Sequence, residues 1–425
     1  MSATSGRPSS EVEQALKGEY APPEAMDIED VPQSVINVPD GGVQAWLSVL
    51  GGYGSLCLHD YIRLFQLVRG IPGLLRPSRR VVPVKYQLDW VNTTVLYVLH
   101  GSTSGLLYVF CMFMLSIADP HKYYQLVLSQ GVGMGIGSGL MLVPAISVQT
   151  HHWRLRRSLA MGIVMTGSGV GGVIYPIMLN RLVTGSAGFA WGVRATAFLT
   201  LGLLAIANAI MTTRLPNARQ RGPGTKPDMK AIMTDGPYWL YVLGLFLVLW
   251  GMFFPYFYLQ LWVNLHGLPG NLAFYTIAIL NAASIFGRTL PNMLADRIGP
   301  FNVLGPVALI TSALVLAMFG VKSTGAVVIF SILYGFFSGA MISLMPPAAA
   351  TLANGLHEIG IRLGIGYFVS SFAMLTGTPI AGALFDDGDQ WYKPIVFCTI
   401  IMFAGAACIA TARSLVARRK RTQRV

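Results

Sequence analysis

The chain has 425 residues, of which 53% are hydrophobic and only 11% are charged, and its formal net charge is +12. A soluble domain carries about twice this charged fraction, roughly 25%. The composition therefore predicts a polytopic membrane protein, and it argues against a soluble enzyme and against a nucleic-acid-binding protein. The positive charge gathers between apolar runs and at the C-terminal end, as is typical of a protein oriented in a bilayer.

The first apolar stretch lies between a polar tail and an atypical basic segment. Residues 1–42 are rich in Ser, Pro, Glu and Asp, which predicts a disordered cytosolic tail. The uncharged run 43–58 is shorter than the ~20 residues that span a bilayer. Residues 59–89 hold six basic residues and three prolines, so they cannot cross a membrane. We expect them on the cytosolic side. An interfacial segment and non-native sequence from a faulty gene model are the alternatives.

Long apolar stretches make up most of the remaining chain, and each predicts a membrane-spanning helix. Four come before a basic linker at 214–237 and six come after it. In chain order they are 91–117, 123–149, 158–180, 195–213, 237–265, 269–293, 301–321, 324–354, 363–385 and 394–412. The chain thus divides into a first half, 43–213, and a second half, 238–412.

Basic residues between these stretches predict the orientation of the chain. They cluster at 154–157, 214–230, 297, 362 and 413–424. If every cluster is cytosolic, the predicted spans pair consistently, two by two. We therefore expect the central linker and the basic tail 413–425 on the cytosolic side of the membrane.

The run NAASIFGRTLPNMLADRIGP at 281–300 begins as an apolar helix and ends as a charged turn. Arg288 lies within the apolar part, eight residues before Asp296, which is roughly 12 Å along a helix. An ionisable residue at membrane depth is costly and is therefore a candidate functional residue. Asp296 and Arg297 stand at the end of the run, followed by Gly299 and Pro300, which stop the helix.

Three runs together resemble fungal members of the monocarboxylate-transporter-like branch of the major facilitator superfamily. They are PDGGVQAW at 39–46, RRSLAMGIVMTGSGVGGVIYP at 156–176, and the run at 281–300. The resemblance implies an all-α polytopic membrane protein, a bundle of two pseudo-symmetric helical halves. The sequence departs after 104–108, because the Asp-Arg-x-Gly of the first-half loop motif does not follow. We therefore expect about 10–11 spans instead of 12, with a truncated or aberrant helix 2 region.

The resemblance also implies a substrate site on the eighth helix. Mammalian members carry an Asp-x-x-x-Arg pattern there, whose arginine binds the substrate carboxylate. Arg288 matches the arginine, whereas Ser284 stands in the aspartate position, so we expect no proton transfer through a carboxylate one turn before Arg288. Asn281 and Tyr334 complete the candidate substrate-binding set, with helix–helix hydrogen bonds as their alternative role. Arg288 itself has an alternative, which is neutralisation by main-chain carbonyls or extension to the cytosolic face.

Two further sets of residues follow from these motifs. By resemblance, Asp296, Arg297 and Gly299 form a gating loop that brackets the inward gate, with a plain helix-end cap as the alternative. Glycines spaced by four on neighbouring predicted helices let backbones approach closely and are expected to pack helices together. These are Gly131, Gly135, Gly139, Gly167 and Gly171.

The function implied is secondary-active transport of a small organic anion, a monocarboxylate first of all, by alternating access. We expect no enzymatic activity, cofactor, metal site or nucleic-acid partner. The seven histidines are scattered, and the chain contains no GxxxxGK[ST] loop. Proton coupling is left open. The alternative is a transport-dead relative, acting as a sensor or produced by an aberrant gene model. A multi-pass location in the plasma membrane is favoured over the vacuole or another internal membrane.

Overall fold

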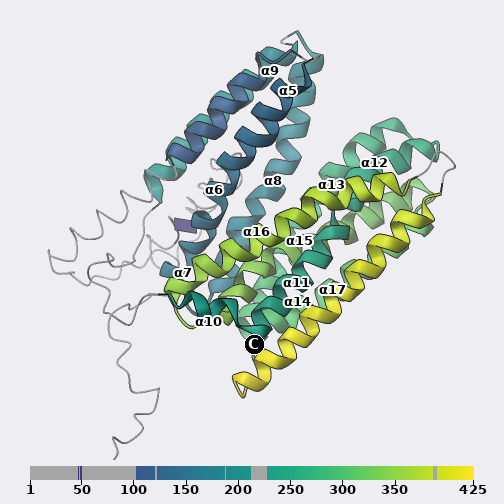
Figure 1. Ribbon diagram of the computed structural model, residues 1–425. Helices are drawn as coiled ribbons and strands as arrows, with labels where there is room; N and C mark the ends of the chain where they lie inside the picture. The colour runs from purple at the N-terminus through teal and green to yellow at the C-terminus, as the bar shows by residue number, and fades with distance from the viewer. Residues whose placement is uncertain are drawn as a thin grey trace, which may run out of the picture. The chain divides into compact units, whose positions relative to one another are not determined.

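The computed structural model describes Trp46, Ser48, Val49 and residues 102–119, 122–186, 188–211, 227–385 and 390–425. These residues form helices joined by short turns (Figure 1). The predictions for the tail 1–42 rest on residues outside this set, as do those for the basic segment 59–89 and most of the linker. The helix count of the first half therefore stays a prediction.

After Trp46, Ser48 and Val49, the next described element of the first half is a short apolar helix, Ser102–Leu115. The next stretch, from 123 to 152, is a helix with a π-helical segment, and Pro144 lies inside it. The elements are α5 (Tyr123–Leu126), η1 (Val127–Gly133), α6 (Met134–Ser147), α7 (Gln149–His152), α8 (Arg157–Thr184) and α9 (Gly188–Ile210).

The second half contains the six helical stretches expected from the sequence. They are preceded by the short helix α10 (Met229–Met233). The elements are α11 (Gly236–Met252) with α12 (Phe254–Leu265), α13 (Gly270–Ile298), α14 (Pro300–Ala317) with the 3₁₀ turn η3 (Met318–Gly320), α15 (Thr324–Leu352), α16 (Leu356–Ala383) and α17 (Tyr392–Arg419).

Eight helical stretches among the described residues are long and apolar enough to cross a membrane. This confirms the all-α polytopic fold class. The 29-residue helix α13 is also long enough to cross a membrane, and it carries the polar residues Asn281, Arg288, Asn292 and Asp296. Arg288 and Asp296, which the sequence singles out for function, thus lie on one long helix of the second half.

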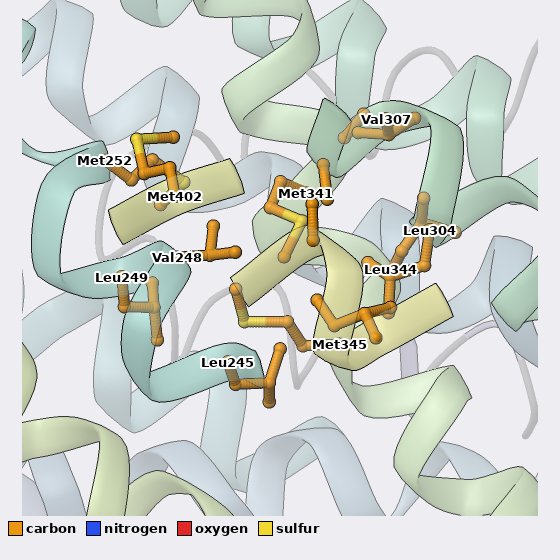
Figure 2. Packing of buried hydrophobic residues seen from close by; sticks show 14 of the residues in the cluster. Leu245, Val248, Leu249, Met252, Leu304, Val307, Met341, Leu344, Met345 and Met402 are labelled. Carbon is orange, nitrogen blue, oxygen red and sulfur yellow. The ribbon is translucent and has the colours of Figure 1, made fainter. Parts of the chain in front are cut away.

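The core of the second half is built from aliphatic and methionine side chains of α11, α14, α15 and α17. Figure 2 shows the centre of this cluster, where side chains of these four helices meet. Met252, Met341, Met345 and Met402 are each at most 3% exposed. Methionine fills irregular gaps between helices well, because its side chain is unbranched and flexible.

Glycines bring the helices of this half into backbone contact. A Cβ atom at Gly287 of α13 would collide with the main-chain oxygen of Phe336 of α15, and one at Gly335 would collide with that of Leu280. A Cβ at Gly244 of α11 would lie 2.9 Å from the main-chain oxygen of Gly405 of α17. Small residues at such crossings allow the close approach on which helix packing in membranes depends.

The predicted packing glycines of the first half are placed differently. A Cβ at Gly135 or Gly139 would meet no atom of the described residues within 4 Å, and one at Gly131 would meet only Val127. The close contacts of this helix are made instead by Gly133 and Gly137, which face the helix Ser102–Leu115. Gly167 and Gly171 of α8 are buried. Their packing role stays a prediction.

Several helices extend beyond the spans that hydropathy predicts, α16 and α17 among them. The sequence placed spans at 363–385 and 394–412, but α16 begins at Leu356 and α17 continues to Arg419. These predictions were wrong in their bounds because hydropathy marks the part of a helix that suits lipid, whereas a helix continues as long as its backbone hydrogen bonds do. The extra turns carry charged side chains.

A small part of the PDGGVQAW region is described, and it packs on the turn that precedes α8. The Trp46 ring lies 5.1 Å from the Trp153 ring in an edge-on arrangement. Gln149 Nε2 donates to the main-chain oxygen of Ser48 at 2.8 Å. Val49, Trp153 and residues of α8 form a separate apolar cluster here. The segment around Trp46 and Val49 therefore packs against the turn before α8 and against the start of α8.

Candidate functional site

Arg288 lies in the interior and contacts the opposite half of the molecule. Its side chain on α13 is 4% exposed. Nη1 donates to the main-chain oxygen of Met165 at 2.7 Å and also donates to the hydroxyl of Ser168. Both acceptors belong to α8 of the first half. The buried cation predicted from the sequence thus joins the two halves by hydrogen bonds.

Glycines on α8 make this contact possible. A Cβ at Gly162 would lie 2.9 Å from the Asn292 side chain and would collide with the main-chain oxygen of Arg288. One at Gly169 would lie 3.0 Å from Ser284 Oγ, and one at Gly172 would lie 2.6 Å from the Asn281 side chain. One face of α8 therefore fits closely against the polar residues of α13.

Asn281 and Ser284 lie in this same seam between helices. Asn281 Nδ2 donates to Gly172 O at 3.3 Å and to Ile277 O at 3.0 Å. Ser284 Oγ donates to Asn281 O at 2.7 Å, and its side chain is fully buried between Gly169 of α8 and Gly339 of α15. In this conformation both side chains serve helix packing, and their contact with substrate stays a prediction.

Tyr334 belongs to an aromatic group with Tyr256 of α12 and Phe330 of α15. Its hydroxyl donates to the main-chain oxygen of Met252 at 2.5 Å, at the break between α11 and α12. Its ring lies 6.2 Å from that of Tyr256, whose hydroxyl is 3.1 Å from Ser338 Oγ. Tyr334 and Tyr256 thus both make hydrogen bonds between helices of the second half.

The gating loop contacts the first half at the start of α8. Asp296 accepts hydrogen bonds from the main-chain nitrogens of Ser158 at 2.8 Å and of Leu159 at 3.0 Å. The N-cap residue of α8, Arg156, makes no side-chain cap of its own. The carboxylate therefore satisfies free N–H groups of a helix in the other half, where the helix dipole also favours negative charge.

The other two residues of the gating loop differ in their surroundings. Arg297 is exposed. Gly299 has φ +103°, a value that side chains other than glycine rarely adopt, and the next residue, Pro300, begins α14. The sharp turn between α13 and α14 thus depends on a glycine at this position.

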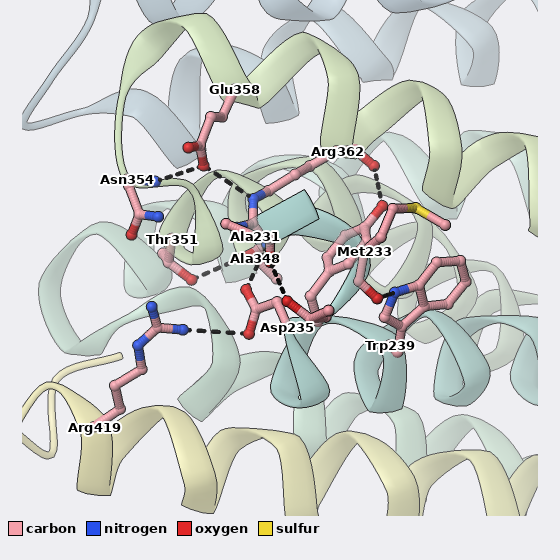
Figure 3. A network of polar contacts seen from close by, with 12 residues as sticks. Ala231, Met233, Asp235, Trp239, Ala348, Thr351, Asn354, Glu358, Arg362 and Arg419 are labelled. Atoms are coloured by element: carbon pink, nitrogen blue, oxygen red, sulfur yellow. Dashed lines mark hydrogen bonds and ion pairs between the residues drawn. The ribbon is translucent and has the colours of Figure 1, made fainter. Parts of the chain in front are cut away.

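A buried ion network lies near the ends of α11, α16 and α17 (Figure 3). Arg362 Nη1 is 2.7 Å from Asp235 Oδ2, and Arg362 Nε is 3.3 Å from Glu358 Oε2. Arg419 Nη1 is 3.2 Å from Asp235 Oδ1. Arg362 is 1% exposed, and its guanidinium lies 5.0 Å from the centre of the Tyr238 ring. The network fixes three helices of the second half to one another.

Sequence reasoning missed several of these residues. Arg362 was interpreted as a loop cation that marks the cytosol, although Glu358 four residues earlier is the spacing of a helical ion pair. Ser168 lies in a quoted motif but was not singled out. The Met165 contact uses a main-chain oxygen, which no side-chain pattern reveals.

Comparison with known proteins identifies relatives over most of the chain. A model of the Major Facilitator Superfamily matches residues 94–320. The aspyridones efflux protein apdF of Emericella nidulans is 35% identical over 385 residues, covering 86% of this chain and 77% of that protein. The MFS-type transporter pynF of Aspergillus niger is 33% identical, with 90% and 91% covered. The agnestins efflux protein AgnL12 of Paecilomyces divaricatus is 37% identical, with 73% and 70% covered.

Solved structures share the fold at low sequence identity. The transporter FucP in its outward conformation aligns with a TM-score of 0.61 and 12% identity, covering 87% of this chain and 98% of that one. The human organic anion transporter MFSD10 aligns with a TM-score of 0.57 and 13% identity, covering 86% and 98%. Family match, relatives and fold agree, and the chain belongs to the major facilitator superfamily.

Proposed function

We propose that this protein is a secondary-active transporter that carries a small organic anion out of the cell by alternating access. Its family moves small molecules across membranes, and two of its relatives are named as efflux proteins. A protein that exports a molecule from the cell acts in the plasma membrane, so we propose this location. A monocarboxylate is the substrate class that we favour, because of the chemistry at Arg288.

Arg288 carries this proposal. A guanidinium in a low-dielectric interior is costly, and it binds a carboxylate through two parallel hydrogen bonds. In the present conformation its Nη1 donates to Met165 O and Ser168 on the opposite half. A carboxylate that binds Arg288 would compete with these contacts. Binding of the anion would thus weaken a link between the two halves, which is the coupling that alternating access needs.

Transport into proteoliposomes tests the proposal. The probes are radiolabelled benzoate, a small monocarboxylate, and benzamide, its uncharged analogue of nearly the same shape. We expect saturable counterflow of benzoate and none of benzamide. Arg288→Lys keeps the charge but loses the planar fork, so it should reduce benzoate flux strongly, and Arg288→Ala should abolish it.

Arg181→Ala is the matched control, because Arg181 is an exposed arginine at the far end of α8. It should transport benzoate like the unaltered chain. Near-normal flux through Arg288→Ala would refute the role of Arg288. Absence of flux through the unaltered, well-folded chain would favour the transport-dead alternative.

A further inference from the structure

The last six residues, Lys420–Val425, turn back and contact the gating loop. Arg424 Nη2 donates to the main-chain oxygen of Asp296 at 2.7 Å. The main-chain oxygen of Val425 accepts from the nitrogens of Phe301 at 3.1 Å and Asn302 at 3.3 Å, and Val425 is 2% exposed. We call this segment the strap. Its last residues therefore contact the start of α14.

Asn302 joins the strap to the end of α17. Its Nδ2 donates to the main-chain oxygens of Gln423 at 2.5 Å and Ile298 at 2.6 Å. Its Oδ1 accepts from Arg413 Nε at 2.8 Å, while Arg413 Nη2 donates to Gln423 Oε1 at 3.0 Å. The loop, the strap and α17 thus share one polar cluster.

Gly299 shows how closely the strap fits. A Cβ atom there would collide with the main chain of Val425. The positive φ of Gly299 already restricts this position to glycine, and the strap leaves no space for a side chain. The turn between α13 and α14 and the strap therefore fit as one unit.

The first residue of the strap contacts the end of α15. Lys420 Nζ donates to Thr351 O at 2.6 Å. Partial burial, together with the positive charges of Arg419 and Arg157, lowers the pKa of Lys420. The strap is thus attached to α15 at the point where it leaves α17.

Asp296 is held from both sides by these contacts. Its carboxylate accepts from the N-terminus of α8 in the first half, and its main-chain oxygen accepts from Arg424 in the strap. We propose that Arg424 and the strap position Asp296 and so hold the predicted inward gate closed. This inference rests on the proposed alternating-access function and adds the C-terminal segment to its gate.

Cysteine labelling of the gate tests this proposal without a transport assay. Ser158 is 3% exposed beneath Asp296, and Ser158→Cys changes one atom of its side chain. The purified full-length chain in nanodiscs is treated with a polar maleimide, and labelling of the native cysteines is subtracted. We expect Arg424→Ala to raise the labelling rate of this cysteine several-fold, because opening exposes the start of α8.

Arg418→Ala is the matched control. It removes the same side chain from the last turn of α17, where Arg418 is exposed, and it should leave the rate unchanged. Arg424→Lys keeps a donor and should restore slow labelling. Equal rates in the Arg424→Ala and Arg418→Ala backgrounds would overturn the proposal.

A disulfide that links the strap to α14 should have the opposite effect to Arg424→Ala, because it prevents the strap from leaving. In Asn302→Cys combined with Gln423→Cys, oxidation should slow labelling at Ser158→Cys below the reduced level, and a reductant should reverse this. An unchanged rate on oxidation would count against the strap. If the chain proves unable to transport benzoate while these labelling differences persist, the proposed function fails and the strap stands.

Discussion

The two halves of the molecule are held together in different ways. In the second half, helices meet through glycine contacts, a methionine-rich core and a buried ion network. In the described part of the first half, α6 turns Gly135 and Gly139 toward space that no described atom fills. Helix α8 packs more extensively against α13 of the second half than against its own neighbour α9.

This difference indicates where the contacts between the two halves are concentrated. Helix α8 belongs to the first half by sequence, but Arg288 and Asp296 of α13 hold its middle and its start. The helices of the second half thus pack mainly against one another, and α8 is the described helix of the first half that packs most extensively against them. Movement between the halves must break these contacts.

The largest effect should come from the ion network of the second half. Arg362→Ala leaves Asp235 and Glu358 buried with reduced compensation, which typically costs about 3–5 kcal/mol. We expect a strong loss of thermal stability in detergent. Arg181→Ala in the first half, at an exposed site, should change stability by less than about 0.5 kcal/mol.

A triple variant sharpens this test. Asp235→Asn, Glu358→Gln and Arg362→Gln together leave no uncompensated charge among these three residues, so we expect a smaller loss than for Arg362→Ala alone. If the triple variant is the less stable of the two, the network stabilises the second half in another way than by charge compensation.

Glycine substitutions compare packing in the two halves directly. Gly287→Ala should destabilise the protein by about 1–3 kcal/mol, because the added methyl group collides with the Phe336 main chain. Gly135→Ala should be neutral, or stabilising by up to about 1 kcal/mol, because it removes a helix-interior glycine without a described neighbour. Melting temperatures of the two variants check this, and equal losses would show that the halves are packed alike.

Removal of the cap between the halves should have the smallest effect on stability. Asp296→Ala deprives Ser158 and Leu159 of their acceptor, which we expect to favour opening by about 1 kcal/mol, or roughly fivefold. Maleimide labelling of Ser158→Cys measures this. Arg297→Ala changes the adjacent exposed residue and should label at the original rate. If Asp296→Ala and Arg297→Ala label at the same rate, the Asp296 carboxylate does not hold the start of α8 closed.

Much of the fold could be predicted because long apolar runs alternate with basic, glycine- and proline-rich turns. The span expected at 324–354 is α15, Thr324–Leu352, and the stop at Gly299-Pro300 is where α13 ends. The start of α16 and the end of α17 could not be placed, because these turns lie outside the apolar region while remaining helical. The strap was predicted only as a basic tail, since its contacts are mostly to main-chain atoms.

The candidate site was predicted in part for a related reason. Arg288 and Asp296 are charges that stand out against apolar neighbours, so the sequence reveals them. Their partners are a main-chain oxygen, a serine hydroxyl and two main-chain nitrogens on another helix. Such groups become visible only once helices are placed in space. The substrate roles of Asn281, Ser284 and Tyr334 remain predictions.

The central claim is that anion binding at Arg288 is linked to opening at Asp296. The most direct measurement is the labelling rate of Ser158→Cys in nanodiscs, with and without benzoate, with benzamide as the uncharged control. We expect benzoate to raise the rate several-fold, benzamide to leave it unchanged, and Arg288→Ala to abolish the response. A labelling rate that does not change when benzoate is added, or a benzoate response that persists in Arg288→Ala, would contradict the claim.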